Sequence, residues 1–107
     1  MRRGTVCWIN LEPSTPPEFG KVRPGVIISN SEQNLRLSTV VVLPFSSLPP
    51  EIWPLRVECT LFKNKPSFAV IPGLRQVDKR RLQQAIGFLP PHIMRRIDEA
   101  LEMYLKD

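Results

Sequence analysis

The 107-residue sequence is long enough for one hydrophobic core and too short for two, so we expect a single domain over residues 1–107. Fifteen Lys and Arg residues against ten Asp and Glu give a formal charge of +5, which favours an anionic partner. No apolar run approaches the length needed to cross a bilayer, so we expect no membrane-spanning segment. Twelve prolines indicate several short elements joined by stiff turns.

Stretches rich in β-branched or alternating apolar residues predict strands. The clearest is residues 55–61, where apolar side chains at the odd-numbered positions alternate with polar ones, as in a strand with one buried face. The expected strands are residues 4–11, 24–30, 39–45, 55–61 and 68–72, with a short sixth strand at 86–89. The expected connections are proline-rich loops at 12–23 and 46–54, a polar segment at 30–38 and a turn at 63–67.

Helical segments are expected in the last third of the chain. Asp78 is a typical N-cap residue for one or two helical turns within residues 74–85. We expect a longer helix over residues 90–107, because apolar residues recur there at helical spacing. Its expected buried stripe is Ile93, Ile97, Ala100, Leu101 and Tyr104. The pattern predicts a small, mostly antiparallel β-barrel or curled sheet closed by a C-terminal helix.

The two cysteines indicate the redox environment of the protein. Cys7 and Cys59 both fall in expected strands, and they form no spaced disulfide framework. The sequence shows no secretory signal pattern. We therefore expect two reduced, buried thiols in a cytoplasmic protein.

The residue inventory excludes several kinds of catalytic site. The one histidine, His92, cannot form a catalytic histidine pair. The sequence has no HExxH motif, no CxxC pair and no carboxylates at metal-binding spacing, so we expect no metal site. It also lacks the GxxxxGK[ST] loop that binds nucleotide phosphates, and we expect no cofactor.

An arginine directly before a proline opens the strand expected at 24–30. Pro24 restricts Arg23 to extended backbone geometry, so its guanidinium is held within a limited range of directions. A guanidinium is permanently charged, and its planar fork of donors suits a phosphate. It can also stabilise charge that develops on a phosphoryl group. From the residues alone, Arg23 is either such a group or an ordinary surface arginine.

The order of the sequence motifs carries more information than any one of them. RRGTVCWINLEP, a loop with Glu18, GKVRPGVIISN, TVVVLPFSS, LRQVDKRRL and IDEALEMYL follow one another over nearly the whole chain. In this order and spacing they closely resemble the MazF/PemK family of toxin ribonucleases. The resemblance implies an SH3-like barrel shared with the CcdB gyrase poisons, a homodimer and a cognate antitoxin that blocks the RNA groove. It also implies metal-independent cleavage of single-stranded RNA, in which the 2′-OH attacks the adjacent phosphorus and leaves 2′,3′-cyclic phosphate and 5′-OH ends.

The resemblance assigns roles to individual residues. The family's catalytic arginine before proline corresponds to Arg23, and its hydroxyl at the end of the third strand corresponds to Ser46, where the family usually has threonine. The residues expected to bind RNA or to support the site are Glu18, Lys21, Arg75, Lys79 and Trp53. Trp53 would either stack on a base or pin its loop to the barrel.

The sequence departs from the family pattern at three further positions. Pro72 and Gly73 stand where the family usually shows an acidic residue and Gln, and Thr5 stands where it usually has Asp. Other interpretations therefore stay open at the level of sequence. The protein could be a non-catalytic binder with the same barrel, which poisons gyrase or binds RNA without cutting it, or a decayed toxin retained to bind its antitoxin.

Overall fold

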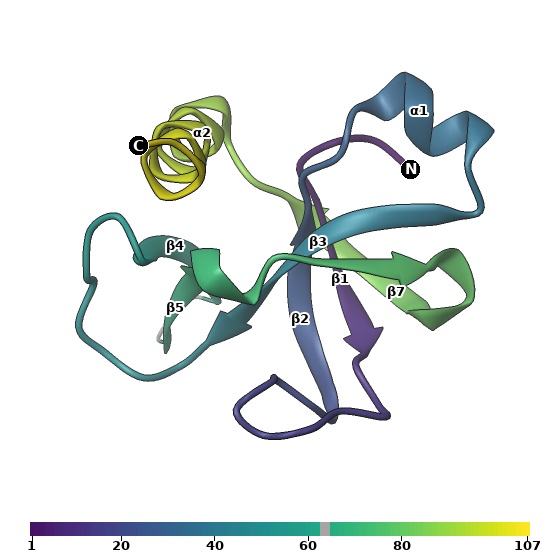
Figure 1. The fold of residues 1–107 in the computed structure, drawn as a ribbon, viewed down its shortest axis with the longest axis horizontal. Coiled ribbons are helices and arrows are strands. Elements are labelled where there is room, and N and C mark those ends of the chain that lie inside the picture. Colours follow the sequence, from purple (N-terminus) through teal and green to yellow (C-terminus); the bar gives the residue numbers. More distant parts are fainter. Residues whose placement is uncertain (63–64) are drawn as a thin grey trace.

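Seven antiparallel strands form a strongly curled sheet in the computed structural model, which describes residues 1–62 and 65–107 (Figure 1). The strands are β1 (Thr5–Asn10), β2 (Val22–Ile27), β3 (Thr39–Ser46), β4 (Arg56–Phe62), β5 (Lys65–Val70), β6 (Arg75–Asp78) and β7 (Leu82–Phe88). The helices are α1 (Ser31–Arg36) and α2 (Pro91–Leu105), with 3-10 turns η1 (Ile71–Gly73) and η2 (Lys79–Arg81). This architecture confirms the predicted curled antiparallel sheet with a C-terminal helix.

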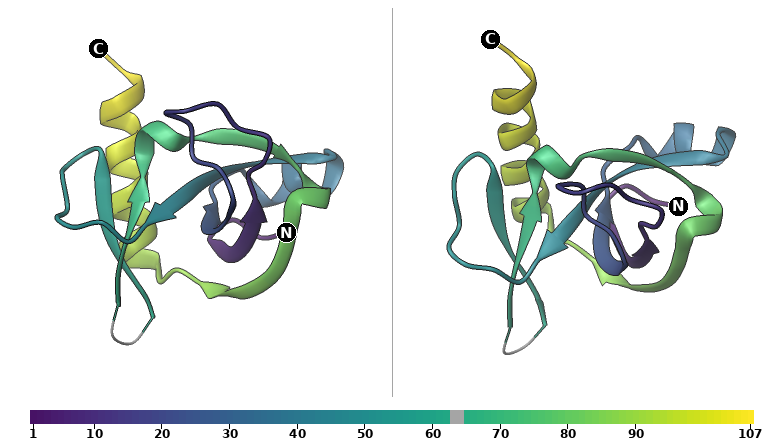
Figure 2. Two further views of the ribbon diagram at one scale, coloured as in Figure 1. Left: turned by 90° about the horizontal axis from the view of Figure 1, so that it is seen from below. Right: turned by 60° about the horizontal axis from the view of Figure 1, so that its bottom comes forward.

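The sheet bends at β3, the strand that pairs with three others. The strand order is β4-β5-β3-β2-β1-β7, and β6 also pairs with β3. Along one edge β3 pairs with β2, and along the other it pairs first with β6 through residues 39–42 and then with β5 through residues 45–46. This change of partner turns the β4–β5 hairpin away from the other strands, as both views in Figure 2 show.

Alternating side chains on the central strands fill two hydrophobic clusters, one on each face of the sheet. On β3, Leu43 and Phe45 belong to one cluster, whereas Val40 and Val42 belong to the other. The outer cluster, beneath α2, contains Val6, Val26, Leu43, Phe45, Val57, Cys59, Ala69, Ile71, Leu89, Met94, Ile97 and Ala100. The inner cluster, within the curl, contains Cys7, Ile9, Leu11, Ile27, Val40, Val42 and Val77.

Both cysteines are buried free thiols in strands, as the sequence predicts. Burial raises the pKa of Cys7 to about 11 and that of Cys59 to about 12, because the thiolate loses its hydration. The two side chains therefore pack as small apolar groups, one in each cluster.

The first three turns of α2 cover the outer cluster. Four of the five helix positions that were predicted to be buried contact this core, namely Ile93, Ile97, Ala100 and Leu101. The prediction missed Met94, which is buried, and was wrong for Tyr104, which is 45% exposed. Tyr104 lies in the last turn, which projects beyond the sheet (Figure 2). No helix of the described chain is long and apolar enough to span a membrane.

Residues 30–38, expected to be a plain polar connection, contain the helix α1. The Asn30 side chain caps this helix, because its oxygen accepts hydrogen bonds from two backbone amides of the first turn, at 2.9 and 3.2 Å. Asn34 is buried, and its amide donates to the backbone oxygens of Met1 and Ser29 at 3.1 and 3.0 Å. These polar contacts stabilise a helix too short to show an apolar period.

Asp78 caps the single 3-10 turn η2, which confirms its prediction as an N-cap residue. Its carboxylate accepts hydrogen bonds from the backbone amide and the side chain of Arg80, and these contacts lower the pKa of Asp78 to about 2. The segments on either side are strands rather than helix. The prediction of further helix within residues 74–85 was wrong, because pairing of β6 with β3 and of β7 with β1 overrides local propensity.

The ends of some strands differ from those expected. β2 begins at Val22, so Arg23 lies within the strand and not before it. Leu55 precedes β4 and is 40% exposed, although the alternating pattern placed it in the core. Of the turn expected at 63–67, Lys63 and Asn64 lie outside the described residues, and the rest belongs to β5.

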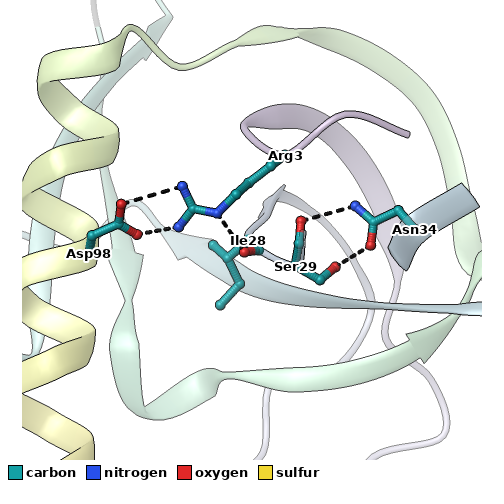
Figure 3. Close-up of polar contacts among 5 residues, drawn as sticks. All are labelled: Arg3, Ile28, Ser29, Asn34 and Asp98. Atoms are coloured by element: carbon teal, nitrogen blue, oxygen red, sulfur yellow. Dashed lines mark hydrogen bonds and ion pairs between the residues drawn. The ribbon is translucent and has the colours of Figure 1, made fainter. Parts of the chain in front are cut away.

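Arg3 ties the N-terminal segment to β2 and α2 (Figure 3). Its guanidinium donates to the carboxylate of Asp98 on α2, and its Nε atom donates to the backbone oxygen of Ile28 at 2.8 Å. Beside it, the Ser29 hydroxyl donates to the Asn34 side-chain oxygen at 2.6 Å. These contacts fix the end of β2 opposite to the end that carries Arg23.

Shortening Ile97 should destabilise the fold strongly, because its side chain is fully buried between α2 and the sheet. We expect Ile97→Ala to lower the free energy of unfolding by about 2–5 kcal/mol. Met103→Ala on the same helix is the matched control, since Met103 is 56% exposed and its loss should change stability by less than about 0.5 kcal/mol. Urea denaturation of both variants measures this difference, and equal stabilities would contradict the packing of α2.

Candidate active site

A pocket of about 540 Å³ lies between the β1–β2 loop and the segment from η1 to β6. Its walls are mostly apolar, and the charged side chains in them are Glu18 and Arg75. The loop contributes Leu11, Glu18 and Phe19, and the opposite wall contains Pro72, Gly73 and Arg75. Pro44 of β3 also lines the pocket, which places it at one end of the curled sheet.

Arg23 is the second residue of β2 and is half-buried beside this pocket. Its Nε atom donates to the backbone oxygen of Gly20 at 3.1 Å. Its Cζ atom lies 4.7 Å from the centre of the Phe19 ring, within the range of a cation–π interaction. Arg23 makes no ion pair with any residue that the structure describes. Because Phe19 lines the pocket, these contacts hold a positive charge at its edge and leave most of the guanidinium donors available.

Two further guanidinium groups are anchored to the start of the β1–β2 loop. Arg75 donates through Nη1 to the backbone oxygen of Leu11 at 2.9 Å. Arg81 donates through Nη1 to the backbone oxygens of Asn10 and Glu12. Within residues 1–62 and 65–107 neither arginine forms an ion pair. Backbone oxygens thus position these side chains without neutralising them, which favours an anionic ligand.

Carboxylates within the β1–β2 loop fix its shape. The Glu18 side chain accepts a hydrogen bond from the backbone N–H of Thr15 at 2.7 Å. The Glu12 side chain accepts one from the backbone N–H of Lys21, whose φ of 64° is unusual for a residue other than glycine. Glu18 therefore supports the loop that carries the pocket wall, while the Lys21 residue is exposed.

Ser46 ends β3 and is only 6% exposed. In the antiparallel pairing of β2 with β3, Gly25 lies opposite Pro44. Arg23 is two residues before Gly25 and Ser46 is two residues after Pro44, so both lie at the same end of the β2–β3 ladder. The Ser46 hydroxyl accepts hydrogen bonds from a backbone amide of the following loop at 3.1 Å and from Nη2 of Arg56 at 3.4 Å. The structure therefore brings the two predicted catalytic residues to one end of the sheet, with Arg56 as the side chain bonded to the hydroxyl.

Lys79 and Trp53 do not line the pocket. Lys79 begins η2, and its backbone N–H donates to the backbone oxygen of Ser38 at 2.9 Å. The Trp53 ring faces Arg96 of α2, whose Cζ atom lies 5.1 Å from the ring centre, and Arg96 donates to Glu51 at 2.8 Å. Trp53 thus attaches the β3–β4 loop to α2, and its stacking on a base stays a prediction.

The chemistry of this end of the sheet comes from guanidinium groups and a hydroxyl. Planar guanidinium donors bind phosphate oxygens and can stabilise charge that develops on them in a transition state. Across residues 1–62 and 65–107, no three His, Cys, Asp or Glu side chains form a group that could hold a metal ion. The arrangement fits a ligand that carries phosphate.

Comparisons with known proteins agree in fold and family. A family model described as PemK-like, MazF-like toxin of type II toxin–antitoxin system matches residues 2–105. The chain is 34% identical over 112 residues to endoribonuclease MazF of Staphylococcus epidermidis, a match that covers 98% of this chain and 91% of that protein.

Solved structures give the same result for the fold. A crystal structure of MazF from Deinococcus radiodurans matches with a TM-score of 0.84 at 20% identity, over 98% of this chain and 96% of that one. An endoribonuclease in complex with its cognate antitoxin from Mycobacterial species matches with a TM-score of 0.81 at 22% identity, over 98% and 94% of the two chains.

This chain belongs to the PemK-like, MazF-like toxins of type II toxin–antitoxin systems. The family and the fold predicted from the sequence motifs are thereby confirmed. At the level of the family, the comparisons support a toxin endoribonuclease over a non-catalytic barrel binder.

In this MazF-like toxin, Pro72 and Gly73 form an apolar pocket wall. A Cβ atom at Gly73 would lie 2.7 Å from the Pro44 ring, so a larger residue would force η1 away from β3. The close contact between this turn and Pro44 of β3 thus requires a glycine at position 73 in this structure.

Sequence reasoning missed two residues that the structure places at the site. Phe19 holds Arg23, and Arg56 contacts the Ser46 hydroxyl. Phe19 could have been noticed, because it is the one aromatic residue in the proline-rich loop before Arg23. Nothing in the sequence marked Arg56 as a site residue, because the alternating pattern of residues 55–61 placed it on the solvent-exposed face of a strand.

The contact between Glu51 and Arg96 gives the β3–β4 loop a pH-dependent attachment to α2. The Arg96 side chain and the Glu58 backbone N–H donate to the Glu51 carboxylate, and these hydrogen bonds lower its pKa. A carboxyl group with a lowered pKa stabilises the folded state above its unfolded pKa, and this stabilisation is lost as the pH falls through the folded value.

We therefore expect Glu51→Gln to be less stable than the wild type near neutral pH. The difference should shrink as the pH falls below about 4, the ordinary carboxyl pKa, because the wild-type side chain then also becomes neutral. Thermal unfolding of both proteins as a function of pH measures this difference. Glu102→Gln, at an exposed position of α2, is the matched control, and a Glu51 effect that does not vary with pH would contradict the attachment.

Proposed function

We propose that this MazF-like toxin is an endoribonuclease that cleaves single-stranded RNA, with Arg23 as its main catalytic residue. The observation that carries the proposal is the Arg23 guanidinium, which Gly20 and Phe19 hold beside the pocket without an ion pair to any described residue. A relative that shares 34% of its residues is named an endoribonuclease. A fixed guanidinium that no carboxylate neutralises can stabilise the charge that develops on a phosphoryl group.

In the proposed reaction, the 2′-OH of one nucleotide attacks the adjacent phosphorus. The bond from phosphorus to the 5′ oxygen of the next nucleotide breaks as the bond from the 2′ oxygen forms. The 2′-OH gives up its proton and the leaving 5′ oxygen takes one up, which leaves a 2′,3′-cyclic phosphate and a 5′-OH. Negative charge increases on the non-bridging oxygens during this step, and Arg23 and the Ser46 hydroxyl donate hydrogen bonds to them. Because the guanidinium supplies the positive charge, we propose that the step needs no metal ion and no cofactor.

The remaining predicted residues bind or support the RNA in this proposal. Arg75 lies in the pocket wall and contacts a phosphate, while Lys21 and Lys79 attract the RNA backbone. Glu18 holds the β1–β2 loop in shape. Trp53 stacks on a nucleotide base of the RNA, in addition to its contact with Arg96.

The family suggests a protein partner for this toxin, namely an antitoxin. One structural relative is described in complex with its cognate antitoxin, and we propose that a cognate antitoxin binds this toxin over the same pocket and blocks it. We also propose a cytoplasmic location, which the two buried free thiols favour.

We further propose that the toxin is a homodimer. Exposed apolar side chains of β7, Ile86 and Phe88, offer surface for self-association. Light scattering on the purified protein should give twice the chain mass of 12.3 kDa. A mass of one chain at all accessible concentrations would contradict the dimer.

The catalytic assignment predicts that Arg23→Ala abolishes RNA cleavage and leaves the fold intact. The purified protein is incubated with a long single-stranded RNA in EDTA, and the fragment ends are analysed chemically. We expect 5′-OH and 2′,3′-cyclic phosphate ends from the wild type, and a loss of rate of at least about 100-fold in the variant. Arg95→Ala is the matched control, because Arg95 is exposed on α2 and its loss removes the same charge.

Binding to a 2′-O-methylated RNA, which lacks the nucleophile, separates an enzyme from a binder. Affinity should fall as salt rises, because phosphate contacts release counterions. Normal cleavage by folded Arg23→Ala would overturn the catalytic role. Salt-sensitive binding without any cleavage of unmodified RNA by the wild type would indicate the non-catalytic binder instead.

A further inference from the structure

We propose that Arg56 is a positioning residue for the Ser46 hydroxyl, which it fixes as a hydrogen-bond donor toward the scissile phosphate. This inference rests on the proposed function and concerns the same site. Arg56 is the first residue of β4 and is half-buried, ten positions after Ser46. Arg56 is not among the residues to which the family resemblance gives a role in the site.

Arg56 holds the segment after Ser46 at several points. Its Nη1 atom donates to the backbone oxygen of Leu48 at 2.8 Å, and its Nη2 atom donates to Oγ of Ser46 at 3.4 Å. Its backbone N–H donates to the backbone oxygen of Ile52 at 2.6 Å, and the Ile52 N–H donates back at 3.1 Å. One residue therefore sets the path of the chain directly after β3.

The hydrogen bonds at Ser46 decide the role of its hydroxyl. A serine hydroxyl has one donor hydrogen and two acceptor lone pairs. Both acceptor positions are used, by the backbone N–H of Leu48 at 3.1 Å and by Arg56. Among the residues that the structure describes, the Ser46 hydroxyl donates to none. The hydroxyl is therefore arranged to donate, and it is unsuited to accept a proton as a general base.

The charge on Arg56 strengthens this arrangement. Arg56 makes no ion pair within the described chain, so its full positive charge lies beside the hydroxyl oxygen. A hydroxyl that accepts from a cation is polarised and becomes a better donor. Because Ser46 is nearly buried, little water competes for its hydrogen. The geometry supplies a donor beside the end of β2 where Arg23 lies.

A double-mutant cycle on RNA cleavage tests this role. The wild type, Arg56→Met, Ser46→Ala and the double variant are compared by kcat and KM. Methionine keeps the length of the side chain but removes the donors and the charge. We expect Arg56→Met to lower kcat about tenfold or more with little change in KM, and to have a much smaller effect in the Ser46→Ala background.

Two further variants complete the experiment. Arg56→Lys keeps a charge and a donor close to Ser46 and should restore part of kcat, which also decides the question if Arg56→Met does not fold. Arg95→Met, on the exposed side of α2, is the matched control for loss of one positive charge.

The outcomes separate this inference from the proposed function. Cleavage by the wild type that depends on Arg23, together with multiplicative effects of Arg56→Met and Ser46→Ala, would mean that Arg56 acts independently of the hydroxyl and would overturn the positioning role. A rise in KM alone would make Arg56 a simple RNA contact and would also overturn it. If the folded wild type does not cleave RNA, the proposed function fails first and this role fails with it.

Discussion

The pairing of β3 with three other strands is the constraint on which the rest of the fold depends. A flat sheet would bury one face under α2 and leave the other to solvent. Because β3 leaves β6 and continues alongside β5, the sheet curls, and its second face becomes a core of its own. The same bend brings the ends of β2 and β3 together with the β1–β2 loop, where Arg23 and Ser46 lie.

Five arginines of this protein fall into two groups according to what anchors them. Arg3 and Arg96 pair with carboxylates and join α2 to the rest of the chain, so their charge is largely cancelled. Arg23, Arg75 and Arg56 are held by backbone oxygens, an aromatic ring or a hydroxyl. Such neutral anchors limit the motion of the side chain and preserve its charge, which suits the binding of an anion.

Sequence reasoning identified the fold because its main signals are local. Alternation along residues 55–61 reports a strand with one buried face, and the β-branched run at 39–45 reports a strand buried on both faces. The Asp78 cap is read from one residue. The helix α1 was missed because its stability comes from the capping and burial of polar asparagines rather than an apolar period. Motif order placed Arg23 and Ser46, whereas the contact of Ser46 with Arg56 depends on the path of the β3–β4 loop, which no short pattern encodes.

The β1–β2 loop contributes both to the inner cluster and to the pocket wall, and a mutation cannot change one contribution without the other. Leu11 belongs to the inner cluster and Phe19 packs against it, yet both also line the pocket, and Phe19 holds the guanidinium of Arg23. A mutation that reshapes the pocket at these positions therefore also loosens the packing of the inner cluster. Divergence of the pocket within this lineage should accordingly depend on compensating changes elsewhere in the inner cluster, and a new pocket shape should evolve more readily in a toxin with stability to spare.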